Sequence, residues 1–296
     1  MRFGLVGTGP WAAMAHGPGL LAGEGVELVG VWGRSPERAR TLATSLGVSA
    51  YDDFEALLAS VDAVAFAVPP QIQAELALMA ANAGKHLLLD KPIAMTASAA
   101  NALRDAATSA GVASVVFFTD RFADASRAWF RDVLTTEGWR GGWLRSFSSL
   151  QAPDNPFGSS SWRWENGALW DTGPHALSTL STALGPARSL TAVAGDGDLV
   201  TLVIRHESGV TSTAVLTLFA PPAAAGFEAA VWGEAGTSRM PPRADRSQSD
   251  LLAIAAQELV ESALSGVPHE VAVTFGARIV DLLADAQAQI DAARGS

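Results

Sequence analysis

A lysine and a histidine, far apart in the sequence, carry side chains suited to acid–base chemistry on an alcohol or a carbonyl group. Lys91 stands in Asp90-Lys91-Pro92, directly after the apolar run at residues 87–89. His175 ends the stretch Asp171-Thr172-Gly173-Pro174-His175. An ammonium group stabilises an oxygen that becomes negative, and a neutral imidazole accepts the proton of an alcohol. The two groups therefore predict interconversion of CH–OH and C=O beside a hydride carrier.

The residues before His175 indicate how its imidazole would be held. Pro174 favours the first turn of a helix, so we expect His175 at a helix N-terminus, where the dipole keeps the ring neutral. Asp171, four residues earlier, would orient His175 or bind a substrate hydroxyl. Simpler alternatives remain: Asp171 as a helix cap, His175 as a hydrogen-bonded core histidine, and Lys91 as an exposed loop lysine.

A glycine-rich segment, Gly7-Thr8-Gly9-Pro10-Trp11-Ala12, follows the first apolar run and opens a helix. It fits the Gly-x-Gly-x-x-Gly/Ala pattern of dinucleotide-binding proteins. In that pattern Gly7 allows a tight turn, Gly9 lets the backbone approach a pyrophosphate, and Ala12 permits close packing of helix on strand. Free N–H groups at the helix N-terminus attract phosphates. We therefore expect Gly7 to Trp11 to bind a dinucleotide, and a merely structural turn is the alternative.

The end of the second apolar run, at residues 26–32, selects the nucleotide. NAD-binding proteins usually carry Asp or Glu there, whereas this chain has Gly33-Arg34-Ser35. A small residue followed by an arginine and a hydroxyl suits a 2′-phosphate, so the sequence favours NADP, with NAD possible. Alternatively, Ser35 only caps the next helix and Arg34 is solvated. The missing acid also argues against a methyltransferase.

The first part of the chain, residues 1–119, alternates strand and helix signals. Short apolar runs are typical of strands covered on both faces, and the repeated strand–helix units predict a doubly wound α/β domain with a parallel sheet. Strands are expected at 3–6, 26–32, 61–68, 87–89 and 112–118. Helices are expected at 35–46, 53–59, 71–83 and from Thr96 or Ser98.

The second part, residues 120–296, predicts an α+β domain with an open, mainly antiparallel sheet. Residues 199–206 and 211–219 alternate like paired strands around the turn Ser208-Gly209, and 227–233 adds another strand. Helices are expected at 125–135, 174–184, 250–264 and 275–293. Loops are expected at 151–161, 220–226 and 236–249.

Composition excludes several classes of function. The chain has 296 residues and a formal net charge of −10 without a basic cluster, which disfavours nucleic acid and anionic membranes as partners. No apolar run is long enough for a membrane span, and we expect a cytoplasmic protein. There is no Cys, and the histidines at 16, 86, 206 and 269 are scattered, so no metal site is predicted.

Several motifs, in this order and spacing, resemble the Gfo/Idh/MocA family of glucose–fructose oxidoreductases and inositol dehydrogenases. The resemblance extends over almost the whole chain. Besides the glycine-rich segment, its carriers are Asp62 to Pro70, Ala83-Gly84-Lys85-His86 leading to Asp90-Lys91-Pro92, the looser match Asp120-Arg121-Phe122, Trp162-Arg163, and Gly167 to His175.

The resemblance implies an N-terminal nucleotide domain and a C-terminal domain whose open sheet joins subunits into a dimer or tetramer. It implies hydride transfer on sugars, polyols or related small carbonyl compounds. Lys91 would bind the reacting oxygen, His175 would be the acid/base, and Asp171 would bind a neighbouring hydroxyl. The resemblance also implies that the cofactor is contacted by a set of further residues, with Trp162 and Arg163 near the nicotinamide. The others are Val68, Pro69, Pro70, Gln73, Asp90 and Lys91.

The sequence departs from the family pattern at three positions and leaves other functions open. Asp90 replaces the usual Glu, and Gln73 stands where His is frequent. Ser178 replaces a second Asp that helps to bind polyols, which argues against inositol as the substrate. The alternatives are a dinucleotide-binding sensor without turnover, and a glycosidase- or lyase-type relative that uses tightly bound NAD.

Overall fold

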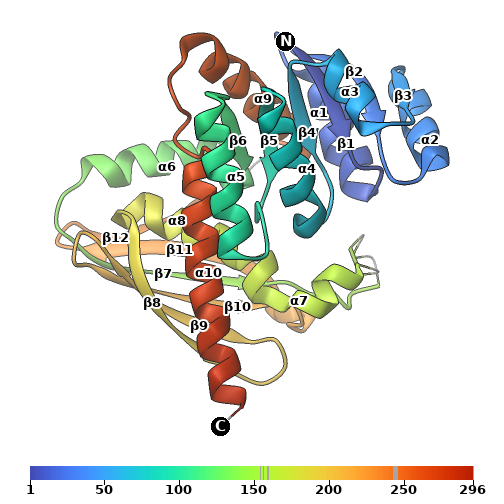
Figure 1. The fold of residues 1–296 in the computed structure, drawn as a ribbon. Coiled ribbons are helices and arrows are strands. Elements are labelled where there is room, and N and C mark those ends of the chain that lie inside the picture. Colours follow the sequence, from blue (N-terminus) through green and yellow to red (C-terminus); the bar gives the residue numbers. More distant parts are fainter. Residues whose placement is uncertain (154, 156, 159, 243–245, 296) are drawn as a thin grey trace. The chain divides into compact units, whose positions relative to one another are not determined.

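The computed structural model describes residues 1–153, 155, 157–158, 160–242 and 246–295, in two compact units. Unit 1 consists of Met1–Phe122 and Asp245–Val280, and unit 2 consists of Ala123–Ala244 and Asp281–Ser296. Figure 1 shows that each unit has its own sheet. Parts of the predicted loops 151–161 and 236–249 lie outside the described residues.

Sheet A of unit 1 confirms the predicted doubly wound α/β fold. Six strands of the described chain lie in the order β3-β2-β1-β4-β5-β6, and every neighbouring pair is parallel. The order of strands reverses beside β1, and open α/β sheets bind ligands at such a switch point, outside the carboxyl ends of the strands. The strands are β1 Arg2–Val6, β2 Glu27–Trp32, β3 Ser49–Tyr51, β4 Ala63–Phe66, β5 His86–Asp90 and β6 Ser114–Phe117.

The helices of unit 1 begin where capping residues predict them. The side chains of Ser35, Asp53 and Thr96 each accept a hydrogen bond from a backbone N–H of the first turn that follows. The helices are α1 Gly17–Ala22, α2 Pro36–Leu46, α3 Phe54–Ser60, α4 Pro70–Asn82, α5 Ala97–Ser109 and α9 Gln248–Ser265, with the short turns η1 Ala12–His16 and η2 Thr119–Arg121.

Helix α9 and the first turns of α10, from the end of the sequence, extend unit 1 beyond the domain boundary expected at residues 119–120. Helix α9 packs against α1, because Gly19 has no side chain: a Cβ there would lie 2.7 Å from the carbonyl oxygen of Ser249. The backbone N–H of Val116, in β6, donates to the carbonyl of Val271, which ties the segment between α9 and α10 to β6. Helix α10, Val273–Arg294, contains the division between the units. Sequence order alone did not predict this return of the chain.

Sheet B of unit 2 is mixed and mostly antiparallel. Its order is β12-β11-β7-β10-β9-β8 among the described residues, and only the β7–β10 pair is parallel. The predicted antiparallel pair is confirmed as β9 and β10. The strands are β7 Trp139–Phe147, β8 Ala187–Ala194, β9 Val200–His206, β10 Thr211–Thr217, β11 Gly226–Gly233 and β12 Gly236–Arg239. The remaining elements are α6 Asp124–Thr135, α7 Ser161–Asp171, α8 Gly173–Leu184 and η3 Pro222–Ala224.

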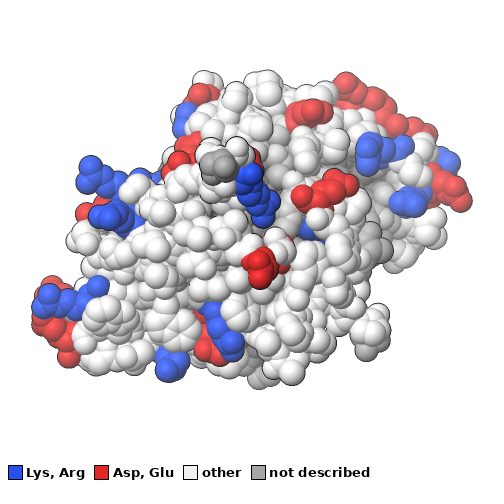
Figure 2. All heavy atoms as spheres, turned by 90° about the horizontal axis from the view of Figure 1, so that it is seen from below, with Lys and Arg blue, Asp and Glu red and all other residues white. Residues whose placement is uncertain are grey.

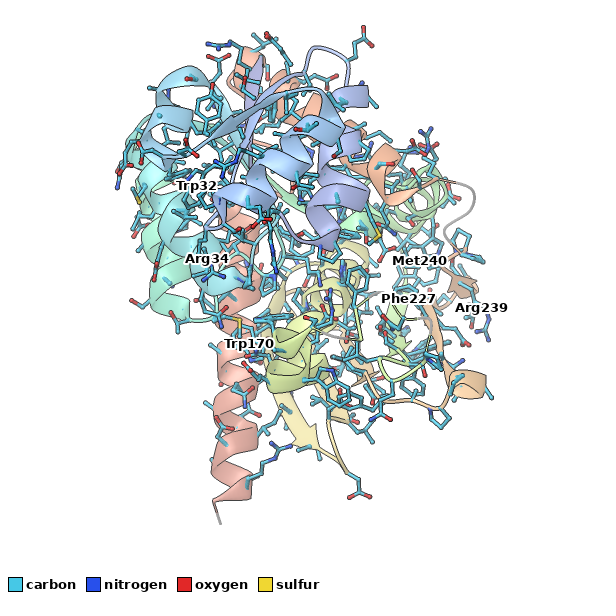
Figure 3. The ribbon with its side chains drawn as sticks, turned by 90° about the vertical axis from the view of Figure 1, so that its right-hand side faces the viewer. Trp32, Arg34, Trp170, Phe227, Arg239 and Met240 are labelled. Atoms are coloured by element: carbon cyan, nitrogen blue, oxygen red, sulfur yellow. The ribbon has the colours of Figure 1, made fainter. Side chains whose placement is uncertain are left out.

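One face of sheet B forms the core of unit 2. Alternate residues such as Leu144, Leu202 and Ala214 are fully or almost fully buried, as the two-residue period of a strand requires. On the opposite face, Trp232 is 48 % exposed and covers Gly141, where a Cβ would collide with its indole ring. Arg239, labelled in Figure 3, lies over the Trp143 ring. This face of sheet B therefore carries aromatic side chains that are at least partly exposed.

The charged side chains do not gather into a single field on the face shown in Figure 2, where blue and red groups are interspersed. The described part of the chain contains no helix that is both long and apolar enough to cross a membrane.

Candidate active site

The glycine-rich turn follows β1 and contains two glycines with different surroundings. Gly7 has a φ of +127°, and a Cβ there would lie 2.3 Å from the carbonyl oxygen of Ala67. Only glycine fits this close approach to the end of β4. Around Gly9, no described residue other than its chain neighbours has a heavy atom within 4 Å of an ideal Cβ position. The open space above Gly9 is the kind of backbone cradle that a pyrophosphate occupies, so the turn fits a dinucleotide.

The helical segment after this turn starts with a wide π-turn, η1. The N–H of Gly17 donates to the carbonyl of Ala12, five residues earlier. Pro18 is the reason: it has no N–H to offer and would crowd the carbonyl four residues before it in a regular α-helix. The wider turn ends at His16, whose side chain is fully buried. In the sequence His16 is only one of several scattered histidines, although Pro18 inside the helix indicates an irregular turn.

At the end of β2, Gly33 is buried and Arg34, labelled in Figure 3, is exposed. A Cβ on Gly33 would lie 2.7 Å from Cγ2 of Thr8, so the small residue lets the glycine-rich turn lie against this strand. Ser35 accepts a hydrogen bond of 3.3 Å from the N–H of Arg38 and caps α2. The capping role of Ser35 is therefore present, and its O–H remains a donor.

Asp90 and Lys91 lie at the carboxyl end of β5. The Oδ1 atom of Asp90 accepts a 2.7 Å hydrogen bond from the N–H of Lys91. Its Oδ2 atom accepts a 2.6 Å hydrogen bond from Nε1 of Trp11, in the glycine-rich turn. Asp90 thus joins the two predicted site segments of unit 1. The Lys91–Pro92 peptide bond is cis.

Gln73, on the first turn of α4, is fully buried, and its side-chain amide binds backbone groups of the segment Asp90-Lys91-Pro92. Its Oε1 atom accepts from the N–H of Asp90 at 2.8 Å, and its Nε2 atom donates to the carbonyls of Asp90 at 2.8 Å and of Pro92 at 3.3 Å. Val68 lies beside the glycine-rich turn, 3.2 Å from the Cβ position of Gly7, and Pro69 precedes α4.

His16 lies beneath this junction. Its Nε2 atom is 3.9 Å from Oδ2 of Asp90, and its ring meets those of Trp11 and Phe117 edge-on. Neither ring nitrogen has a hydrogen-bond partner of standard geometry among the described residues. Burial lowers the pKa of His16, and the Asp90 carboxylate offsets this only in part. The ring is therefore neutral at neutral pH.

In unit 2, Asp171 ends α7 and Thr172 precedes α8, so Asp171 is not the cap of α8. Helix α7 is kinked at Gly167, whose φ is +65°. Nε of Arg163 donates a 2.9 Å hydrogen bond to Oδ2 of Asp171, and its guanidinium lies over the Phe157 ring. The carboxylate expected to face substrate is therefore already paired with Arg163.

His175 is the third residue of α8 and is half-buried, at the helix N-terminus that the sequence predicts. One turn later, Ser178 is 2 % exposed, and its hydroxyl has no hydrogen-bond partner among the described residues. Trp162 is half-buried, and its Nε1 is likewise without a partner in the described chain.

The structure thus joins predicted residues within each unit. In unit 1 it joins Trp11, Gln73, Asp90 and the backbone of Lys91; in unit 2 it joins Arg163 and Asp171. Lys91 and His175 belong to different units, so their joint action stays a prediction. No group of three or more His, Asp or Glu in the described residues could hold a metal ion.

Comparison with family models identifies the class of protein. Residues 1–118 match the model described as the oxidoreductase family with an NAD-binding Rossmann fold, and residues 140–239 match the GFO/IDH/MocA C-terminal domain. The chain belongs to the Gfo/Idh/MocA oxidoreductase family.

Individual relatives carry sugar-related names. The chain is 35 % identical over 125 residues to D-xylose 1-dehydrogenase (NADP(+)) 2 of Haloferax volcanii, covering 41 % of this chain and 38 % of that protein. It is 30 % identical over 194 residues to dTDP-3,4-didehydro-2,6-dideoxy-alpha-D-glucose 3-reductase of Streptomyces antibioticus, covering 63 % and 57 %. The matched segments therefore span less than two thirds of these curated relatives.

The fold extends further than the sequence matches. A crystal structure of an oxidoreductase from Agrobacterium radiobacter in complex with NAD+, L-tartaric acid and magnesium superposes with a TM-score of 0.84 at 18 % identity. The superposition covers 100 % of this chain and 97 % of that one. At this identity the likeness establishes the fold.

Proposed function

We propose that the protein is an NAD(P)-dependent oxidoreductase that interconverts CH–OH and C=O on a sugar, a polyol or a related small carbonyl compound. The observation that carries the proposal is the hydrogen-bonded junction between the turn at Gly7–Ala12 and the segment Asp90-Lys91. It lies at the carboxyl edge of sheet A, beside the switch point where open α/β sheets bind ligands. Family membership supports the same class of reaction.

Lys91 binds the reacting oxygen in this proposal. Its ammonium donates a hydrogen bond that strengthens as negative charge develops on that oxygen, which stabilises the transition state more than the ground state. A bound nicotinamide supplies the hydride acceptor or donor. The N–H groups of the glycine-rich turn hold the pyrophosphate, and Val68, Pro69 and Pro70 flank the ribose side.

His175 takes the hydroxyl proton during oxidation and returns it during reduction. The N-terminus of α8 disfavours the imidazolium form, so the ring starts as a proton acceptor. Asp171 binds a hydroxyl next to the reacting carbon. Because Arg163 donates to Oδ2 of Asp171, that carboxylate has a fixed orientation, and we assign Arg163 to orienting Asp171 near the nicotinamide end.

NADP is the favoured cofactor in this proposal. Arg34 is exposed at the end of β2, and Ser35 keeps its O–H donor while it caps α2. Neither side chain repels a 2′-phosphate, and the guanidinium can pair with it. The NADP(+) in the name of the Haloferax relative is in line with this preference.

The two competing functions make different demands. A sensor without turnover does not need Lys91, Asp171 and His175. A glycosidase- or lyase-type relative needs NAD that stays bound through the reaction.

We also propose that the exposed face of sheet B, with Trp143, Trp232 and Arg239, joins two copies into a homo-oligomer. Sedimentation velocity should then give more than one chain per particle, and Trp232→Glu should shift it toward the monomer.

A turnover screen tests the proposed function. NADP+ or NAD+ is mixed with a panel of sugars and polyols, NADPH or NADH with small ketones, and absorbance of the reduced nicotinamide is followed. Lys91→Met and His175→Ala should each lower kcat by at least about 100-fold, while NADPH binding stays nearly unchanged. Full turnover in either variant would overturn the assigned roles. Product formation with no net change in reduced nicotinamide, by a cofactor that does not dissociate, would favour the glycosidase- or lyase-type alternative.

A further inference from the structure

A chain of two hydrogen bonds leads from the glycine-rich turn to the backbone of Lys91. Trp11 donates its indole N–H to one oxygen of Asp90 at 2.6 Å, and the other oxygen accepts the N–H of Lys91 at 2.7 Å. Both bonds are short and charge-assisted, the stronger kind in proteins. The Asp90 side chain is only 16 % exposed, so water competes weakly for its oxygens.

Two side chains, His16 and Trp11, lie close to Oδ2 of Asp90, and only Trp11 donates a hydrogen bond to it. His16 approaches Oδ2 of Asp90 to 3.9 Å without a hydrogen bond of standard geometry, and its buried ring packs edge-on against Trp11. The neutral His16 therefore fills space beneath the carboxylate, and Trp11 supplies the donor. An aspartate is short enough to accept the N–H of the next residue and the indole N–H together.

Gln73 holds the backbone on either side of Lys91 independently. Its buried amide bonds to the N–H and carbonyl of Asp90 and to the carbonyl of Pro92. The carbonyl of the Asp90–Lys91 peptide and the carbonyl of Pro92, on either side of Lys91, are thus fixed from α4. The N–H of Lys91 itself donates to the Asp90 carboxylate, so this hydrogen bond depends on how the Asp90 side chain is oriented.

We propose that Trp11 is a positioning residue for Lys91, acting through the carboxylate of Asp90. The inference rests on the proposed function for its effect on turnover, because Lys91 must meet the reacting oxygen. A side chain within the cofactor-binding turn then affects the chemical step. Loss of its donor should lower kcat much more than it weakens cofactor binding, since the backbone of the turn, not the indole, holds the pyrophosphate.

The first measurement needs no substrate. Amide hydrogen exchange at Lys91, followed by NMR on labelled protein, should be at least about 10-fold faster in Trp11→Phe than in the unmodified protein, because a hydrogen bond to a charged group is lost. Trp129→Phe is the matched control: Trp129 is buried, whereas Trp11 is half-buried, and it likewise donates its indole N–H to a side chain, that of Ser238 at 3.0 Å, in unit 2. It should leave exchange at Lys91 unchanged.

The second measurement uses steady-state kinetics with NADPH or NADP+ and the panel compound that turns over fastest. Trp11→Phe should lower kcat about 10-fold, and the NADPH dissociation constant should change by less than about 3-fold. Asp90→Asn, which places an amide NH2 group, itself a donor, against one of the two N–H donors, serves as a second variant if Trp11→Phe folds poorly. The double variant should be no worse than the poorer single variant, because both remove the same link.

The outcomes separate the two proposals. If no compound turns over, the proposed function fails, and exchange at Lys91 alone decides the role of Trp11. Unchanged exchange at Lys91 in both variants would overturn the positioning role. So would a loss of NADPH affinity in Trp11→Phe with an unchanged kcat, because Trp11 would then serve the cofactor only.

Discussion

Arg163 and Asp171 form a mostly buried ion pair in unit 2. Nε of Arg163 lies 2.9 Å from Oδ2 of Asp171, and the two side chains are 24 % and 11 % exposed. The guanidinium is 4.3 Å from the centroid of the Phe157 ring, which holds it in place. The pair orients a carboxylate four residues before His175.

Arg163→Gln should destabilise the protein and weaken substrate binding. It leaves the Asp171 carboxylate without its charged donor, which costs about 1.5–3 kcal/mol for a mostly buried pair. Urea unfolding measures the loss. The control is Arg140→Gln, since Arg140 pairs with Glu234 where both are more than 60 % exposed, and such pairs contribute about 0–1 kcal/mol. Equal losses in the two variants would contradict a special role for Arg163.

Arg34→Ala should reduce the preference for NADP. An arginine–phosphate contact contributes about 10-fold or more in affinity, so the NADPH dissociation constant should rise by that factor while that of NADH stays within about 2-fold. Fluorescence titration of both cofactors gives the ratio. Arg40→Ala, at an exposed arginine 3.2 Å from Asp52, is the control. An unchanged NADPH/NADH ratio in Arg34→Ala would remove the argument for NADP.

Local signals predicted much of unit 1. Capping side chains such as Ser35 and Thr96, the C-terminal Gly47 and the apolar strands act over a few residues, so the sequence displays them directly. Strand β3 was missed because its three residues, Ser49–Tyr51, are too few for a periodic pattern. The ion pair of Arg163 was missed because it joins the two ends of α7, in a stretch expected to begin as a loop.

Unit 2 was harder to predict because its sheet depends on distant partners. Strand β7 contains Gly141 and Gly142, which weaken a strand pattern, yet the small residues admit Trp232 on one face and Leu184 on the other. The prediction of a loop at 236–249 was wrong at its start, where β12 pairs with β11. The bond between Trp11 and Asp90 joins residues 79 positions apart, which no local pattern displays.

Buried histidines should make the protein less stable below neutral pH. Burial lowers the pKa of His206, whose ring nitrogens lie 2.6 Å from the carbonyl oxygen of Gly185 and 2.7 Å from Oγ of Ser212. Burial likewise lowers the pKa of His16 and His86. Each ring takes up a proton near pH 6.5 when unfolded and only at lower pH when folded, so stability is full above pH 6.5 and falls as the pH drops.

Urea unfolding at pH 7.5 and pH 5.5 measures this difference. The free energy of unfolding should be smaller at pH 5.5, and His206→Gln, although less stable itself, should show a smaller difference between the two pH values. Greater stability at pH 5.5, or an identical pH dependence in His206→Gln, would contradict the assignment for that ring.

Two alanine substitutions in the glycine-rich turn should separate fold from binding. Gly7→Ala forces a Cβ to within 2.3 Å of the Ala67 carbonyl at a φ of +127°, so we expect it to lower the melting temperature by several degrees or to prevent folding. Gly9→Ala adds a methyl group that would have no heavy atom within 4 Å from any described residue other than its chain neighbours. It should change stability by less than about 1 kcal/mol but raise the NADPH dissociation constant at least about 10-fold, because the methyl group occupies the space assigned to the pyrophosphate. Calorimetry measures the change in stability, and NADPH titration measures the change in cofactor affinity. Tight NADPH binding by Gly9→Ala would show that the phosphates do not bind over Gly9.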